Sequence, residues 1–125
     1  MSVSITRTPT IQVYVGIPRK SVLKEGTLTA DGTEQILVEA SGILNLEGYV
    51  DLSAMTNGDQ VVLRRYVKIQ EGGEYRLHAS ETYNGVQAEP LVRFPFIAGY
   101  YGIKVTLQQT AGTYKSFPYQ FFKEI

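Results

Sequence analysis

Hydrophobic and polar residues alternate along most of this chain, and short turn sequences separate the alternating runs. In residues 61–70 the apolar positions Val61, Leu63 and Val67 fall on one side of an extended chain, and Tyr66 and Lys68 fall on the other. Successive side chains of a strand point to opposite faces, so this pattern predicts a strand with one buried face. No segment keeps a helical period over ten residues, and the chain is therefore expected to be all-β.

The same pattern predicts about eight or nine strands. Turns with glycine separate them at positions that need a positive φ angle, namely Asp31-Gly32, Asn57-Gly58, Gly72-Gly73, Asn84-Gly85 and Ala111-Gly112. Pro90 and Pro95 place one strand at a sheet edge, because proline cannot donate to a ladder of hydrogen bonds. The expected strands cover residues 11–17, 22–29, 33–40, 44–52, 61–70, 75–80, 90–97, 101–109 and 113–122.

Alternation also predicts which side chains form the core. In residues 44–52 three hydrophobic residues are expected inside, with Glu47, Tyr49 and Asp51 outside. A single helical turn capped by Ser53 is expected within residues 52–59. The side chains expected on inner faces are Leu46, Val50, Leu52, Leu63, Val67, Ile69, Tyr75, Leu77, Ala79, Tyr101, Ile103, Val105, Leu107, Phe117, Tyr119 and Phe121.

An antiparallel two-sheet β-sandwich is the simplest fold for this pattern, and a jelly roll is one topology that fits it. The 125 residues suit one domain. Residues 21–125 are expected to form that sandwich, and residues 1–20 are either an extended arm or its first strand. No apolar run resembles a secretion signal or is long enough to cross a membrane, so no membrane partner is expected.

Composition narrows the chemistry. The net charge is zero, which argues against a nucleic acid partner, since phosphate binding requires an excess of Lys and Arg. The chain has no cysteine and a single histidine, His78, so neither a thiol site nor a zinc site can be built. Asn57 and Asp59 could offer oxygens to calcium, although Asn-Gly-Asp is also ordinary turn chemistry. We expect no cofactor, no metal site and no catalytic site, hence no enzyme.

Charged residues are unevenly distributed along the chain. Residues 1–24 hold four basic and no acidic side chains, whereas residues 25–60 hold seven acidic and no basic ones. Pairing between strands within one domain would explain this segregation, and so would complementary patches between subunits, because opposed charges steer and register association.

Tyrosines outside the core and the N-terminal segment are the best candidates for an interface. Exposed tyrosine buries area at little entropy cost and keeps a polar tip, which suits an interface. An arm containing residues 11–17 could add a strand to a neighbouring sheet edge. The candidate interface residues are Arg7, Ile11, Val13, Val15, Arg19, Lys20, Tyr49 and Tyr66.

Two stretches, Glu47–Asp59 running into Val61–Ile69 and Tyr101–Tyr114 with its Phe-rich tail, resemble small uncharacterised β-sandwich proteins associated with structural genes of tailed phages and archaeal viruses. The resemblance covers residues 26–125. It implies a virion structural protein (capsid, decoration or tail-associated) that binds itself and other virion proteins and is assembled into virions in the host cytoplasm. The alternative is a carbohydrate-binding or host-recognition module with a glycan as its partner.

Overall fold

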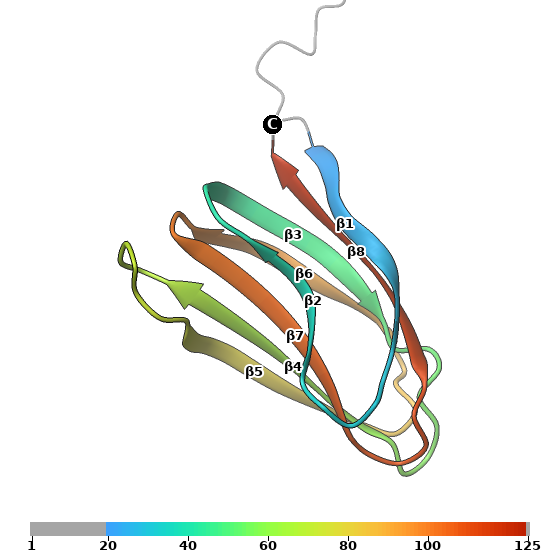
Figure 1. Ribbon diagram of the computed structural model, residues 1–125. Coiled ribbons are helices and arrows are strands. Elements are labelled where there is room, and N and C mark those ends of the chain that lie inside the picture. The colour runs from blue at the N-terminus through green and yellow to red at the C-terminus, as the bar shows by residue number, and fades with distance from the viewer. Residues whose placement is uncertain (1–19, 125) are drawn as a thin grey trace, which may run out of the picture.

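The computed structural model describes residues 20–124 of the chain, and within them the protein is all-β (Figure 1). Short turns connect the strands. The eight strands in this part of the chain are β1 (Lys20–Thr29), β2 (Gln35–Ala40), β3 (Ile43–Asp51), β4 (Gln60–Lys68), β5 (Arg76–Asn84), β6 (Leu91–Gly99), β7 (Gly102–Ala111) and β8 (Ser116–Glu124).

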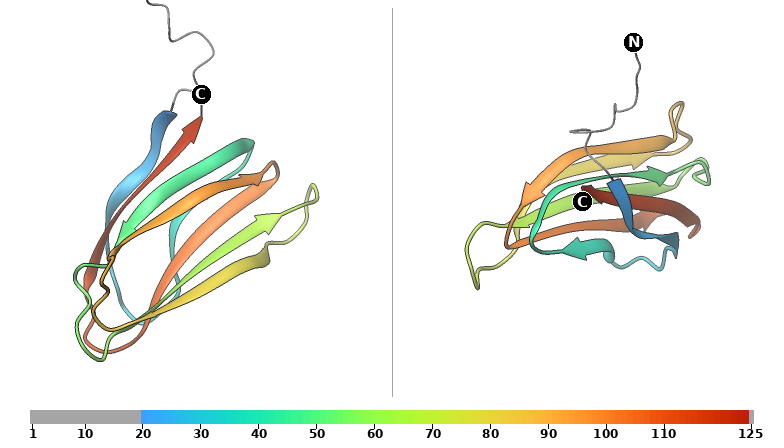
Figure 2. Two further views of the ribbon diagram at one scale, coloured as in Figure 1. Left: turned by 180° about the vertical axis from the view of Figure 1, so that it is seen from behind. Right: turned by 90° about the horizontal axis from the view of Figure 1, so that it is seen from above.

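These strands form two antiparallel sheets of four, which face each other as a sandwich (Figure 2). One sheet has the order β1-β8-β3-β6 and the other the order β2-β7-β4-β5. Only the β4–β5 hairpin stays within one sheet, while the other connections cross from one sheet to the other. The predicted two-sheet sandwich is confirmed.

The pairing of the strands explains this order. β4 pairs with β5, β3 with β6, β2 with β7 and β1 with β8, so the chain forms one long antiparallel ribbon that turns at the β4–β5 hairpin. The pairs β3–β8 and β4–β7 then join successive windings of this ribbon side by side. A rolled ribbon of eight strands is a jelly roll, which was the topology suggested from the sequence.

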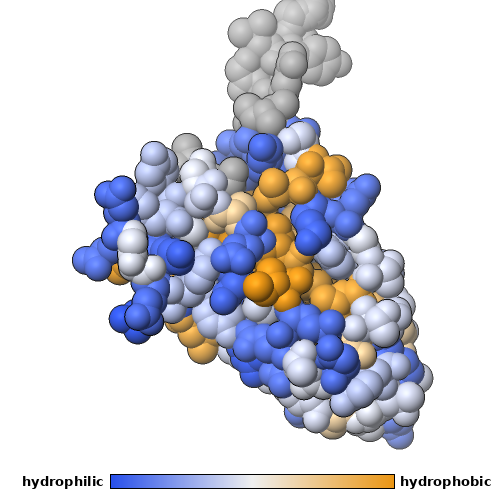
Figure 3. All heavy atoms as spheres, in the orientation of Figure 1, coloured by the Kyte–Doolittle hydropathy of each residue, from blue (hydrophilic) through white to orange (hydrophobic). Residues whose placement is uncertain are grey.

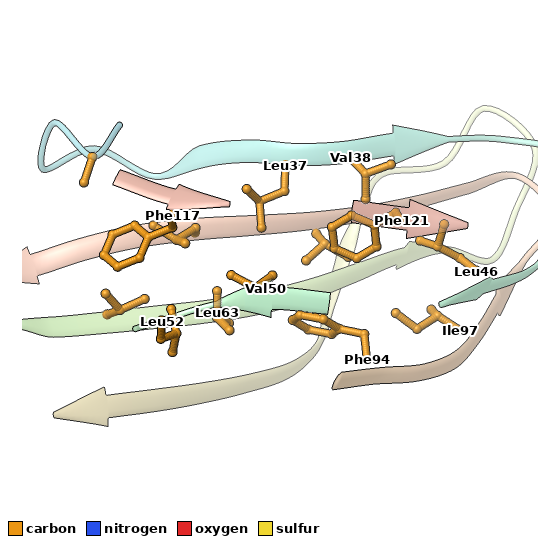
Figure 4. Close-up of a cluster of buried hydrophobic side chains, with 14 of the residues drawn as sticks. Leu37, Val38, Leu46, Val50, Leu52, Leu63, Phe94, Ile97, Phe117 and Phe121 are labelled. Atoms are coloured by element: carbon orange, nitrogen blue, oxygen red, sulfur yellow. The ribbon is translucent and has the colours of Figure 1, made fainter. Parts of the chain in front are cut away.

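The core lies between the sheets and is built from the inner faces of both (Figure 4). Leu46, Val50 and Leu52 of the β3 region are fully buried, which confirms the faces assigned to residues 44–52. The rings of Phe94 and Phe121 meet across β6 and β8 with their centroids 5.7 Å apart. Burial of such side chains is the main force that holds the two sheets together.

Each of the four edge strands, β1, β2, β5 and β6, contains a shift in register. In β2 the shift falls at Leu37, and as a result both Leu37 and Val38 are buried. Bulges of this kind and a proline within an edge strand discourage unwanted pairing with other chains. Pro95 lies in β6, so the predicted edge position of that strand is confirmed.

Four side chains and one segment differ from expectation, and the first of these side chains, Ile69, is 77% exposed just after the end of β4. Leu77 is 56% exposed, because β5 has an extra residue at His78, and this bulge pairs Leu77 with Tyr66 on the outer face. Tyr101 belongs to the exposed turn between β6 and β7 rather than to the inner face of β7. Tyr75 precedes β5 and lies against the lysines of the outer face.

The segment 52–59 contains two tight turns in place of the expected helical turn. Its amides bond to carbonyls three residues earlier, Met55 N to Leu52 O at 3.1 Å and Asp59 N to Thr56 O at 3.0 Å. Asp51 accepts the backbone N–H of Ser53, so the role of cap belongs to Asp51 rather than to Ser53.

Candidate interaction surfaces

The structure describes three of the eight predicted interface residues, Lys20, Tyr49 and Tyr66. Lys20 and Tyr49 lie on strands of the β1-β8-β3-β6 sheet, whereas Tyr66 lies on β4 in the opposite sheet. They therefore do not form one site. The other five residues, Arg7, Ile11, Val13, Val15 and Arg19, are outside the described part of the chain.

Lys20 is the first residue of β1 and makes ion pairs across its own sheet. Its Nζ is 2.6 Å from Glu47 Oε2 on β3 and 3.7 Å from Glu124 Oε1 on β8. The hydrogen bond with Glu47 raises the pKa of Lys20 above its ordinary value. At this position, pairing between the basic and acidic segments of the sequence takes place within one subunit.

Tyr66 is half-buried in a polar network on the outer face of the β2-β7-β4-β5 sheet. Its hydroxyl donates to the carboxylate of Glu34, which also accepts from Thr106 Oγ1 at 2.6 Å and pairs with Arg64 at 3.5 Å. Burial and the bond to Glu34 both raise the pKa of Tyr66. Lys104 Nζ lies 4.7 Å from the centroid of the Tyr66 ring. These intramolecular contacts already occupy much of the polar surface of Tyr66.

Tyr49 lies on the outer face of the other sheet, at the centre of a row that crosses all four strands. The pairing of β1 with β8, β8 with β3 and β3 with β6 aligns Glu25, Gln120, Tyr49 and Arg93. Tyr49 is 38% exposed and lines an open depression of about 590 Å³. Its lining residues are Glu25, Gly26, Thr27, Tyr49, Asp51, Leu91, Pro118, Tyr119 and Gln120.

The polar groups around this depression are held by local hydrogen bonds. Gln120 Nε2 donates to Glu25 Oε1 at 2.7 Å, between β8 and β1. Asp51 Oδ1 accepts the N–H of Ser53 at 2.9 Å and also the hydroxyl of Ser53. The lining thus combines an exposed aromatic ring with two carboxylates and an amide, and contains neither lysine nor arginine.

One end of the sandwich, here called the Tyr100 end, exposes apolar side chains on converging turns. Gly42 N bonds to Tyr100 O at 2.6 Å, which ties the β2–β3 turn to the β6–β7 turn. The rings of Tyr100 and Tyr101 meet edge to face with centroids 5.1 Å apart. Ile69, just after β4, is 77% exposed and Tyr100 is 64% exposed. Ile69 was expected on an inner face, but β4 ends one residue earlier, at Lys68. The signal in the sequence that Ile69 would be exposed is its closeness to the turn residue Gly72.

The opposite end, here called the Asp59 end, carries a buried ion pair between distant turns. Asp59 is 2% exposed, and Lys115 Nζ lies 2.6 Å from its Oδ2. Backbone amides of Thr56 and Thr113 donate to the same carboxylate at 2.9 and 3.0 Å. The bond from Lys115 is the main cause that lowers the pKa of Asp59 to about 2. Asp59 therefore ties the β3–β4 turn to the β7–β8 turn.

Further apolar side chains are exposed along the side of the sandwich where the edge strands β1 and β2 lie. Figure 3 shows hydrophobic residues gathered on this side between hydrophilic ones. Val22 on β1 and Ile36 on β2 are each about half exposed. Exposed apolar groups that occur together indicate a contact surface more strongly than isolated ones.

The described residues hold neither a cluster of metal ligands nor a membrane-spanning helix. Residues 20–124 contain no group of three or more His, Cys, Asp or Glu side chains placed to hold a metal ion. Within the same residues there is no helix with the length and apolar character needed to span a membrane.

No protein-family profile matches the sequence, and no curated protein matches it. Solved structures similar to this chain include the infectious bursal disease virus VP2 subviral particle, at 14% identity, and infectious bursal disease virus Gt strain, at 16%. Each comparison has a TM-score of 0.49 and covers 88% of this chain. The chain spans 33% of the length of those two chains.

Proposed function

We propose that this chain is a structural component of a virus particle, built into virions in the host cytoplasm, where it binds copies of itself and other virion proteins. The observation that carries the proposal is the strand order, β1-β8-β3-β6 facing β2-β7-β4-β5. Virus shells are among the assemblies built from eight-stranded jelly rolls. Because a fold can serve several functions, the surfaces of this jelly roll have to support the proposal as well.

The exposed apolar side chains provide that support. At the Tyr100 end, two tyrosines and an isoleucine are exposed on adjoining turns, and Val22 and Ile36 are exposed on the β1–β2 side. Tyrosine is enriched at the centres of protein interfaces, where it fills pockets on the partner and excludes water. A subunit with such groups at its end and on its side has surfaces through which it can contact more than one neighbour.

The N-terminal segment adds a second mode of contact to the proposal. Ile11, Val13 and Val15 would add a strand to a sheet edge of a neighbouring subunit. After the shift at Leu23, β1 pairs regularly with β8 from Lys24 to Thr29, which leaves a regular stretch of edge backbone for such an addition. Arg7 and Arg19 would then approach the acidic side chains of that subunit that lie within residues 25–60.

Sedimentation velocity and negative-stain electron microscopy of the purified full chain, over a range of concentrations, test this proposal. We expect discrete assemblies of repeating subunits that grow with concentration. A purified chain that stays monomeric up to its solubility limit would show that the proposal is wrong. Deletion of residues 1–19 tests the arm separately, since assembly that survives the deletion removes the arm from the mechanism.

A further inference from the structure

We infer that the depression around Tyr49 is a binding site for an uncharged sugar. This site lies on the outer face of the β1-β8-β3-β6 sheet, away from the Tyr100 end, and residues 25–27 of the edge strand β1 form one of its walls. The inference goes beyond the proposed function and does not depend on self-assembly. Four features of the depression carry it.

The first feature is the ring of Tyr49. It stands on β3, a central strand of its sheet, and is exposed within a depression of about 590 Å³, which is large enough for one or two sugar units. Aliphatic C–H groups cover one face of a pyranose and pack against an aromatic ring. Leu91 on β6 and Pro118 on β8 extend this apolar floor.

The second feature is the set of polar groups at the rim. Sugar hydroxyls both donate and accept, so they pair well with carboxylates and amides, which can bind two adjacent hydroxyls at once. Glu25, Asp51 and Gln120 supply these groups. The bonds Gln120–Glu25 and Ser53–Asp51 hold them in place before a ligand arrives, which lowers the entropy lost on binding.

The third feature is charge. The lining contains two carboxylates and no lysine or arginine, and Arg93, the neighbour of Tyr49 on β6, already pairs with Glu47 at 3.7 Å. A sialylated or sulfated sugar would therefore place its anion beside Glu25 and Asp51. The site therefore selects uncharged sugars over anionic ones.

The fourth feature is the backbone beneath the depression. β8 and β3 pair with strands on both sides, so most of their N–H and C=O groups are already used. An extended peptide laid across this face would find few backbone partners, whereas a sugar needs only side chains. The outer face of the other sheet differs, because Glu34, Arg64, Tyr66 and Thr106 bond to one another there.

A glycan array that carries neutral, sialylated and sulfated oligosaccharides, probed with the full chain, tests the inference. We expect selective binding to neutral glycans. Titration calorimetry with the best neutral oligosaccharide then measures monovalent affinity, so that assembly of the protein does not inflate the result. Tyr49→Ala should weaken binding and raise the dissociation constant about tenfold or more, and a tenfold change corresponds to about 1.4 kcal/mol. Glu25→Ala should weaken binding by a smaller factor.

Tyr114→Ala is the matched control, because Tyr114 is also an exposed tyrosine but lies at the β7–β8 turn, outside the depression. This variant should bind the sugar as the parent chain does. Failure to bind any neutral glycan, preference for anionic glycans, or binding that survives Tyr49→Ala would each overturn the inference. Shifts of the Tyr49 and Gln120 NMR signals with an oligolysine peptide but not with sugar would also overturn it and would identify a basic peptide as the ligand.

Discussion

The two ends of the sandwich solve the same structural problem in opposite ways. Both consist of turns that must be held together without secondary structure. At the Asp59 end a buried carboxylate accepts hydrogen bonds from the β3–β4 and β7–β8 turns and pairs with Lys115. At the Tyr100 end one backbone bond joins two turns, and the side chains of Ile69, Tyr100 and Tyr101 stay exposed.

This difference separates stability from interaction. Polar groups that are buried and paired with one another stabilise the turns but offer little to a partner. Exposed apolar side chains contribute little to the stability of the subunit, yet their burial against a neighbour is favourable. We therefore expect substitutions at the Asp59 end to change unfolding and substitutions at the Tyr100 end to change association.

The largest effect is expected for Asp59→Ala. The change leaves Lys115 without its buried partner and removes the acceptor of two backbone amides, and breaking a buried pair in this way is strongly destabilising. The midpoint of thermal unfolding, followed by circular dichroism, should fall by on the order of 10 °C. Glu71→Ala, at the Tyr100 end, is the control and should shift the midpoint by about 2 °C or less. Equal shifts in the two variants would remove the contrast between the ends.

Gly112→Ala should have the next largest effect. Gly112 has a φ of +88°, and a Cβ there would collide with Asp59 and with Gly58 O. Gly72 at the other end also has a positive φ of +70°, but a Cβ there would meet no atom within 4 Å. Gly72→Ala should therefore cost about 1 kcal/mol from backbone strain alone, and Gly112→Ala clearly more. Urea unfolding of both variants measures this, and an equal cost would mean that the Asp59 turn yields easily.

Acid should weaken the Asp59 end selectively. The pKa of Asp59 is lowered from 3.8 to about 2 in the folded chain, chiefly by the hydrogen bond from Lys115. The folded state therefore binds this proton less readily than the unfolded state, so Asp59 stabilises the fold above about pH 3.8 and loses that contribution as the pH falls to about 2. The midpoint of thermal unfolding of the parent chain should fall as the pH falls over this range, and that of Asp59→Asn should fall less. Identical pH profiles would contradict the assignment.

The sequence allowed the strands and most of the core to be predicted, because alternation is local. Leu46, Val50 and Leu52 were placed correctly, since β3 lies inside its sheet and its inner side chains follow a period of two. Alternation failed at Leu77, where the bulge at His78 moves the side chain to the outer face. Bulges depend on the partner strand, so the sequence of one strand does not reveal them.

The functional surfaces were harder to predict, because they depend on strand order. Asp59 and Lys115 are 56 residues apart and meet only after the ribbon has rolled up. The Tyr49 depression likewise needs Glu25 from β1 and Gln120 from β8. Tyr49 itself was identified from its outward position in the alternation, but its neighbours could not be, since pairing across a sheet is not encoded in the sequence of a single strand.

The smallest effect on stability is expected at the Tyr100 end, where the double substitution Ile69→Ser with Tyr100→Ser should change the free energy of unfolding by less than about 0.5 kcal/mol per site. The same variant should weaken self-association in sedimentation velocity, because it removes exposed apolar surface that a neighbour would cover. Tyr114→Ser is the control, since Tyr114 is also exposed but lies at the Asp59 end, and it should leave association unchanged. If Tyr114→Ser weakened association as much as the double variant, both ends would contribute to assembly, and the division between a stabilising end and a binding end would not hold.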